Sequence, residues 1–243
     1  MANPTAAMLV IGDEILSGRT RDENMYHLAG RLTEVGIDLK EARTVSDDPD
    51  AIIDAVRTLS GTYDQLFTSG GIGPTHDDIT ADCVAAAMGA SIDVREDARA
   101  VLQAHYDRQG IEMNEARLRM ARIPDGACLI DNPVSAAPGF SLGNVHVMAG
   151  VPTIFKAMLE TLLPSLTGGD PVISRTVRIL RAEGDIAGPL GALAADFPGL
   201  SIGSYPFQMD GSFGANILLR GTDEAVITNA ADQLIAAFPD DIA

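Results

Sequence analysis

The chain of 243 residues has few basic side chains. It has 17 lysines and arginines against 34 acidic residues, a formal net charge of −17, and its lysines are confined to Lys40 and Lys156. Proteins that bind nucleic acids need a basic surface that neutralises phosphates, so this balance argues against a nucleic-acid partner. We therefore expect the ligand to be a small molecule.

Cysteines and long apolar runs are also scarce. Cys83 and Cys128 lie far apart in apolar surroundings, which predicts reduced core side chains rather than a disulfide or a metal site. The apolar run at residues 6–11 is too short to span a membrane, and it lacks the basic flank of a signal peptide. We expect a cytoplasmic protein without a membrane partner.

Apolar runs that predict strands alternate with amphipathic stretches that predict helices. Residues 7–11, 37–45, 65–68 and 145–148 have the strand pattern, and helical spacing follows each of them. The segment 94–122 predicts two helical stretches. This alternation is typical of a doubly wound, mostly parallel α/β sheet with right-handed crossovers.

A change in composition at residues 164–171, which are rich in glycine and proline, predicts a linker. We therefore expect an α/β domain at 1–167 and a smaller α+β domain at 171–243. The second domain has the predicted order β-α-β-β-α, with strands at 173–180, 200–205 and 214–220 and helices at 186–197 and 224–238. Its excess of acids over arginines argues against RNA binding.

Residues 66–78 form the most informative stretch. Gly70, Gly71 and Gly73 follow a buried strand, and glycine backbone amides can approach a phosphate closely. The loop ends in two adjacent carboxylates, Asp77 and Asp78, which would repel a phosphate unless a cation lies between them. Asp78 also stands where a helix N-cap is expected. The loop thus predicts a site for phosphate and a metal ion.

Two other predicted strands end in acidic residues. Asp13 and Glu14 follow the first strand, and Asp48 follows the second, where it also suits the N-cap position before Pro49. Ligands bind at the carboxyl ends of the strands in sheets of this class, so we expect these acids beside the glycine loop. Asp13 and Glu14 could instead be a solvated pair in a turn. Asp47, which precedes Asp48, is expected to be solvated.

The motifs of this chain, in their order, resemble the MoCF or molybdopterin-binding fold, and within it the CinA branch with its small KH-like module. The stretches that carry the resemblance are Gly12-Asp13-Glu14-Ile15-Leu16, Asn24, Asp48, Ser69-Gly70-Gly71-Ile72-Gly73-Pro74-Thr75-His76-Asp77-Asp78-Ile79-Thr80, Asn132, Ala137-Pro138-Gly139, Gly150-Val151-Pro152 and Ser201-Ile202-Gly203-Ser204-Tyr205-Pro206. The chain departs from the family pattern at Met120, Ser135, Ala136 and Ala149. Relatives of this fold assemble as dimers or trimers, so the resemblance implies a homodimer or homotrimer.

The leading hypothesis is a metal-dependent pyrophosphatase, for which the resemblance favours ADP-ribose as substrate and FAD as the second candidate. Mg²⁺ or Co²⁺ is the expected divalent metal, with K⁺ as a further ion. Asp13, Asp77 and Asp78 are the expected catalytic residues, and Glu14 joins these three as a metal ligand. The expected phosphate- and substrate-binding residues are Gly12, Asp48, Gly70, Gly71, Gly73, Thr75, Asn132, Pro138, Gly139 and Gly150.

Two alternatives remain open at this point. The first is molybdopterin binding with adenylylation or metal insertion in molybdenum cofactor biosynthesis. The second is a non-catalytic nucleotide-binding sensor or assembly subunit. The sequence has no evident Ser-His-Asp arrangement or nucleophilic cysteine, which argues against covalent catalysis.

Overall fold

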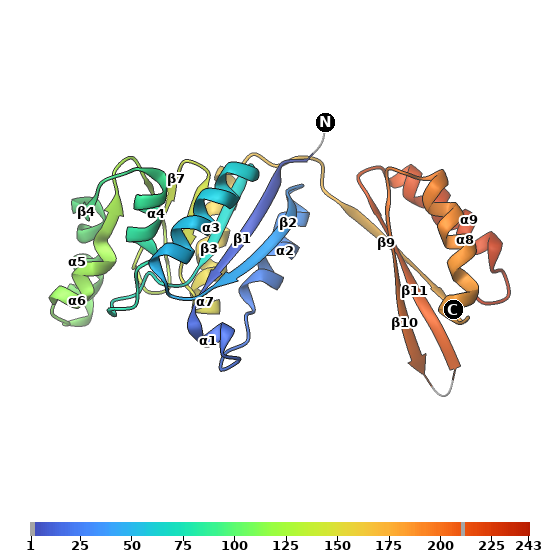
Figure 1. The fold of residues 1–243 in the computed structure, drawn as a ribbon, viewed down its shortest axis with the longest axis horizontal. Helices are drawn as coiled ribbons and strands as arrows, with labels where there is room; N and C mark the ends of the chain where they lie inside the picture. Colours follow the sequence, from blue (N-terminus) through green and yellow to red (C-terminus); the bar gives the residue numbers. More distant parts are fainter. Residues whose placement is uncertain (1–2, 210–211) are drawn as a thin grey trace. The chain divides into compact units, whose positions relative to one another are not determined.

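The computed structural model describes residues 3–209 and 212–243, and the chain divides into two compact units (Figure 1). The first unit is Met1–Gly169 and the second is Asp170–Ala243. Each unit has its own apolar core. None of the helices in the described ranges is long and apolar enough to cross a membrane.

The first unit is built on a six-stranded sheet of order β2-β1-β3-β8-β7-β6. Four neighbouring strands are parallel, and they are β2 (Asp38–Val45), β1 (Thr5–Ile11), β3 (Gln65–Ser69) and β8 (Val145–Met148). At one edge β7 (Gly139–Leu142) and β6 (Cys128–Ile130) run antiparallel. The predicted mostly parallel α/β architecture is therefore confirmed.

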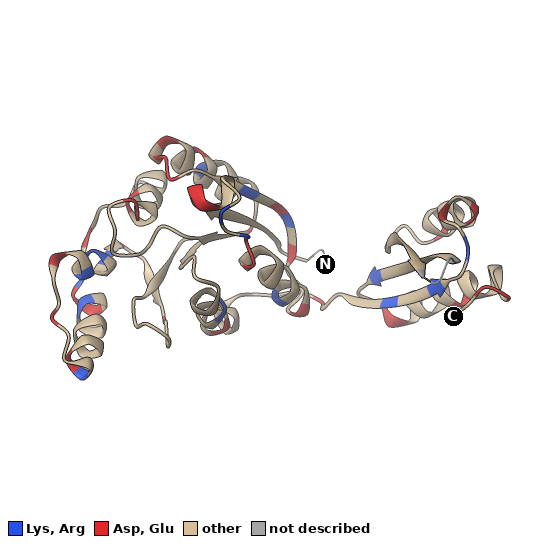
Figure 2. Ribbon diagram, turned by 90° about the horizontal axis from the view of Figure 1, so that it is seen from below, with Lys and Arg blue, Asp and Glu red and all other residues tan. Residues whose placement is uncertain are grey.

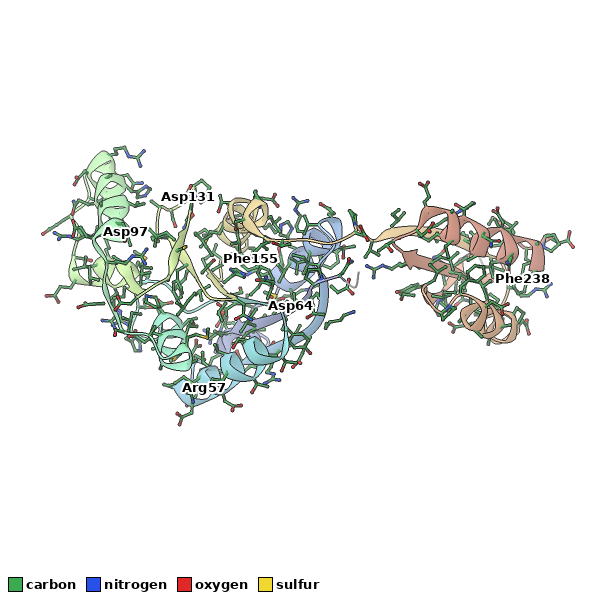
Figure 3. The ribbon with its side chains drawn as sticks, turned by 90° about the horizontal axis from the view of Figure 1, so that it is seen from above. Arg57, Asp64, Asp97, Asp131, Phe155 and Phe238 are labelled. Carbon is green, nitrogen blue, oxygen red and sulfur yellow. The ribbon has the colours of Figure 1, made fainter. Side chains whose placement is uncertain are left out.

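Helices cover both faces of this sheet. Alternate side chains of β1 enter two separate clusters, so the strand is buried on both sides and needs a continuous apolar run. The cluster on one face includes side chains of α3 (Pro49–Thr62), α4 (Thr80–Met88) and α5 (Glu96–Gln109). The cluster on the other face includes α2 (Asn24–Glu34) and α7 (Pro152–Leu162), whose Phe155 is fully buried (Figure 3). This arrangement is doubly wound.

The segment between α4 and β6 differs from the prediction of two helical stretches alone. It contains α5, the short α6 (Glu115–Leu118) and a 3-10 turn, η1 (Arg119–Ala121). It also contains a separate antiparallel pair, β4 (Ile92–Val94) and β5 (Arg122–Pro124), which was not predicted. Strands of three residues are too short for a period-2 pattern to be recognised.

The two cysteines have different environments. Cys83 is buried in α4, where burial raises the pKa of its thiol to about 11. Cys128 is exposed on β6, so its predicted core position is wrong. In the described part of the chain its strand is at the edge of the sheet and pairs with β7 alone.

The second unit has the predicted β-α-β-β-α order. Its elements are β9 (Ile173–Ile179), α8 (Glu183–Asp196), β10 (Ser201–Met209), β11 (Ser212–Gly221) and α9 (Glu224–Ala237). The strands form an antiparallel sheet of order β10-β11-β9, and both helices pack on one face of it (Figure 1). The prediction of a smaller α+β module is confirmed.

Candidate functional site

The ends of the parallel strands meet at one edge of the sheet. The backbone N–H of Gly12 donates to the carbonyl of Val45 at 3.1 Å, and the N–H of Gly70 donates to the carbonyl of Met148 at 3.2 Å. These bonds extend the pairing beyond the strands and hold the following loops together. The loops after β1, β2, β3 and β8 are thus neighbours at their starts.

Glycines allow these loops to approach one another. Gly70 has φ +110°, and a Cβ there would overlap the carbonyl oxygen of Ile11. A Cβ on Gly150 would lie 3.2 Å from the Cα of Gly70. A side chain at Gly70 would therefore push the loop after β3 away from β1. Because the Gly70 amide bonds to Met148, it does not serve as the phosphate donor expected from the sequence.

Thr80, the first residue of α4, anchors the glycine loop. Its hydroxyl donates to the carbonyl of Gly70 at 2.9 Å, and its backbone N–H donates to the carbonyl of Gly71 at 3.0 Å. The side chain is fully buried. Within the described residues the amides of Gly71 and Gly73 have no acceptor, so these two can bind a phosphate.

Asp78 does not cap α4, contrary to the prediction. The helix begins at Thr80, and its N-cap residue, Ile79, makes no side-chain capping bond. The Oδ2 atom of Asp78 instead accepts from the backbone N–H of Thr75 at 2.8 Å and from the Thr75 hydroxyl at 2.6 Å. A Cβ on Gly73 would lie 2.6 Å from the same oxygen. The loop is thus shaped around this carboxylate.

The two residues before Asp78 are exposed. The side chain of His76 is 98% exposed and that of Asp77 is 62% exposed, with 3.9 Å between Nδ1 and Oδ1. The pKa of Asp77 is lowered from its usual value, and the nearby Thr75 hydroxyl is the main cause. The hydroxyl has one hydrogen, so it can donate to only one of the two carboxylates at a time.

The acids after β1 and β2 have separate roles. Asp13 is exposed at the start of α1 (Asp13–Leu16), and its backbone N–H donates to Oδ2 of Asp47 at 2.9 Å. Asp47 was expected to be solvated, but it is partly buried and links the loops after β1 and β2. Oδ1 of Asp48 accepts from the N–H of Ala51 at 2.9 Å, as expected for the N-cap of α3.

Glu14 is partly buried and turns back over Gly12, where a Cβ would lie 2.5 Å from its Oε2 atom. Among the described residues no three His, Cys, Asp or Glu side chains are grouped so as to hold a metal ion. The four expected metal ligands, Asp13, Glu14, Asp77 and Asp78, therefore do not form a complete ligand set by themselves. Asp77 and Asp78 remain an adjacent pair of carboxylates on one loop.

Asn24 connects two of the loops, a role that the sequence did not indicate. This side chain is 3% exposed, and its Nδ2 donates to the hydroxyl of Ser69 at 2.7 Å and to the carbonyl of Gly150 at 2.8 Å. It therefore fixes the end of β3 against the start of α7. Its Oδ1 is buried without a partner in the described part of the chain.

Asn132 was expected to bind substrate, but its side chain is occupied by its own loop. Its Nδ2 donates to the Ser135 hydroxyl at 2.7 Å and to the Ala137 carbonyl at 2.8 Å. Its Oδ1 accepts from two backbone amides at 3.1 Å. Gly139 is needed for packing, since a Cβ there would overlap the carbonyl of Val147. These contacts fix the conformation of the loop between β6 and β7.

A recess opens beside the glycine loop. The loop contributes Gly71, Gly73 and Asp78, and Pro138 and Phe140 lie on the side of β7. The segment 119–123 also lines the recess, with Arg119 and Arg122 among its residues. Basic and acidic residues are mixed over the end of the unit that carries α5 and α6 (Figure 2). Sequence patterns did not reveal the arginines, because no local signal connects them with a loop some 40 residues earlier.

In mostly parallel α/β sheets ligands bind at the carboxyl ends of the strands, which is the edge where this chain carries its glycine loop and carboxylates. Residues 7–168 match the family model described as Probable molybdopterin binding domain. The chain belongs to this family, in its CinA-like branch. Residues 171–243 match the model described as FAD synthase, middle domain, which replaces the expected KH-like assignment.

Individual relatives agree with this assignment. A CinA-like protein of Citrifermentans bemidjiense is 40% identical over 167 residues, which are 67% of this chain and 40% of that protein. A protein of Pyrobaculum calidifontis is 34% identical over 213 residues, 84% of this chain and 81% of that one. The crystal structure of the protein CinA with unknown function from Thermoplasma acidophilum has 34% identity and a TM-score of 0.62, covering 67% of this chain and 97% of that one.

Proposed function

We propose that the chain hydrolyses the phosphoanhydride of a nucleotide with the help of a divalent cation. ADP-ribose is the favoured substrate. FAD is the second candidate, and the match of residues 171–243 to the middle domain of FAD synthase supports its inclusion. The observation that carries the proposal is the turn from Thr75 to Asp78, in which a fixed carboxylate stands beside a second, exposed carboxylate. The amides of Gly71 and Gly73, which have no acceptor among the described residues, belong to the same loop.

The residues present fit a hard cation. Mg²⁺ in phosphate-processing sites is usually held by one or two carboxylates together with substrate phosphates and water. Asp77 and Asp78 supply such a pair, so a third protein carboxylate is not required. Asp13 and Glu14 remain candidate ligands, Mg²⁺ or Co²⁺ the candidate metals, and K⁺ a further candidate ion. The cation would neutralise charge on the phosphates during hydrolysis.

The chain's own groups have distinct tasks in this proposal. The amides of Gly71 and Gly73 donate to phosphate oxygens, and Thr75 keeps the Asp78 carboxylate in one orientation. Asp13 is exposed at the end of β1 and accepts a proton from the attacking water. The water oxygen forms a bond to one phosphorus as the bond from that phosphorus to the bridging oxygen breaks.

The first test is turnover of ADP-ribose and FAD with Mg²⁺ or Co²⁺, with and without K⁺, followed by chromatography of the nucleotide products. We expect metal-dependent cleavage by the wild type and a loss of about 100-fold or more in Asp77→Asn and Asp78→Asn. The matched control is Asp54→Asn, an exposed acid on α3. Equal rates in all four proteins would contradict the proposal.

A second candidate function is molybdopterin binding, with adenylylation or metal insertion. The family match at residues 7–168 favours it. Tight molybdopterin binding by a protein that does not cleave nucleotides would support this function instead. Nucleotide binding without turnover would support the third candidate, a sensor or assembly subunit. We further propose a homodimer or homotrimer, which sedimentation tests.

A further inference from the structure

We infer that Arg119 binds the diphosphate group of the ligand in the recess beside the glycine loop. This inference rests on the proposed function for the identity of the ligand. It adds a substrate-binding residue from the segment between α4 and β6, whose sequence showed no ligand signal. The chemical class bound is a bridging diphosphate, as found in dinucleotides and nucleotide sugars.

Arg119 lies beside the glycine loop. Its Nη2 atom lies 3.4 Å from the backbone carbonyl oxygen of Asp78, and its side chain lines the recess together with Gly71 and Gly73. The η1 turn that holds Arg119 is tied to the unit through Ala121, which is fully buried in the core. The guanidinium is thus held beside the loop that carries the Gly71 and Gly73 amides, which have no acceptor among the described residues.

Arg119 and Arg122 differ in whether a carboxylate balances their charge. Arg122 forms an ion pair with Asp82, so its charge is already balanced. Arg119 contacts a neutral carbonyl group, and no carboxylate among the described residues pairs with it. A cation without a counter-ion at the rim of a recess that also contains Asp78 and Asp82 can attract an anionic ligand.

The recess has both a positive group, Arg119, and negative carboxylates nearby, which suits a diphosphate bound together with a cation. A phosphate could not approach Asp77 and Asp78 without positive charge nearby. Arg119 supplies a permanent positive charge beside the loop, and a guanidinium can donate two parallel hydrogen bonds to phosphate oxygens. Ile72, Met120 and Phe140 also line this recess.

The test compares Arg119→Ala and Arg119→Lys with the wild type in steady-state cleavage of ADP-ribose. We expect Arg119→Ala to raise KM about 10-fold or more and to change kcat by less than about 3-fold, since the lost contact holds the ligand. Arg119→Lys should recover part of the affinity, because it keeps the charge without the planar fork. The matched control is Arg99→Ala, an exposed arginine of α5 paired with Glu96.

Calorimetric titration with ADP-ribose separates this inference from the proposed function. If the wild type cleaves ADP-ribose and Arg119→Ala has the same KM as Arg99→Ala, the inference is wrong and the function stands. If the wild type binds without cleavage and Arg119→Ala binds at least 10-fold more weakly, the inference stands and the function fails. If the wild type neither binds nor cleaves, both fail. Thermal melting verifies that each variant is folded.

Discussion

Thr75 and Asp78 are joined by two hydrogen bonds to a single oxygen atom. The backbone N–H and the hydroxyl of Thr75 donate to Oδ2 of Asp78 at 2.8 and 2.6 Å. The other carboxylate oxygen, Oδ1, has no hydrogen-bond partner among the described residues. This arrangement fixes the direction of the carboxylate and leaves one of its oxygens available to a cation.

Replacing Thr75 by valine removes the hydroxyl but preserves the shape of the side chain and the backbone N–H. We expect kcat/KM for the nucleotide substrate to fall by about 10-fold or more, because a hydrogen bond to a charged carboxylate is lost. Thr75→Ser keeps the hydroxyl and should stay within about 3-fold of the wild type. Equal rates for the valine and serine variants would show that this bond does not orient Asp78.

Gly73→Ala tests whether the loop is shaped around Asp78. The new Cβ would lie 2.6 Å from Oδ2 of Asp78, the end of a side chain that can turn away. We therefore expect the catalytic rate to fall strongly while the free energy of unfolding changes by less than about 1 kcal/mol.

Gly61→Ala is the matched control for this substitution. Gly61 lies in α3, and an added Cβ there meets nothing within 4 Å. Urea unfolding should show a gain of about 0.5–1 kcal/mol, because alanine favours the helix over glycine, with activity unchanged. Normal activity in Gly73→Ala would contradict the proposed role of the Asp78 orientation.

Asn24→Ala tests the link between β3 and α7. The change removes the donors to Ser69 and to the Gly150 carbonyl, and it should lower the free energy of unfolding by about 2–3 kcal/mol. Gln109→Ala, at the exposed end of α5, is the control and should cost less than about 0.5 kcal/mol. A loss in Asn24→Ala no greater than in the control would show that the link adds nothing to stability.

We expect the free energy of unfolding to depend on pH through His146. It is 5% exposed, its ring nitrogens contact Ser141 and Gln65 at 2.8 and 2.7 Å, and burial lowers its pKa from 6.5 to about 4. The unfolded chain therefore takes up a proton first as the pH falls. Above pH 6.5 the titration of His146 does not change the free energy of unfolding. As the pH falls from 6.5 to about 4, it lowers the free energy of unfolding by a growing amount, at most about 3 kcal/mol.

Chemical denaturation at several pH values checks this expectation, with His146→Gln as the variant that cannot titrate. The difference in unfolding free energy between wild type and variant should change across this pH range, in favour of the variant at the acid end. A constant difference between pH 4 and 7 would mean that His146 does not titrate as inferred.

The sequence predicted the elements that are long or buried on both sides. Residues 7–11 and 65–68 form continuous apolar runs because β1 and β3 lie in the centre of the sheet between two layers of helices. The strands β4, β5, β6 and β7 were missed. They have three or four residues each, too few for an alternating pattern to be recognised.

The candidate site was predictable in outline and not in its contacts. The order of strands identified the edge where Gly12, Asp48 and Gly70 start their loops, because that edge follows from the topology. The N-cap at Asp48 was predicted, since it depends on neighbouring residues. The contacts of Asp47, Asn24 and Arg119 could not be predicted, because each joins residues at least 34 positions apart.

The central claim is tested most directly by measuring AMP and ribose 5-phosphate released from ADP-ribose with Mg²⁺ or Co²⁺, by the wild type and by Asp78→Asn in parallel. We predict equal amounts of the two products, no release after chelation of the metal, and a rate lower by about 100-fold in the variant. Release by the wild type that does not exceed that of Asp78→Asn, with either metal, would contradict it.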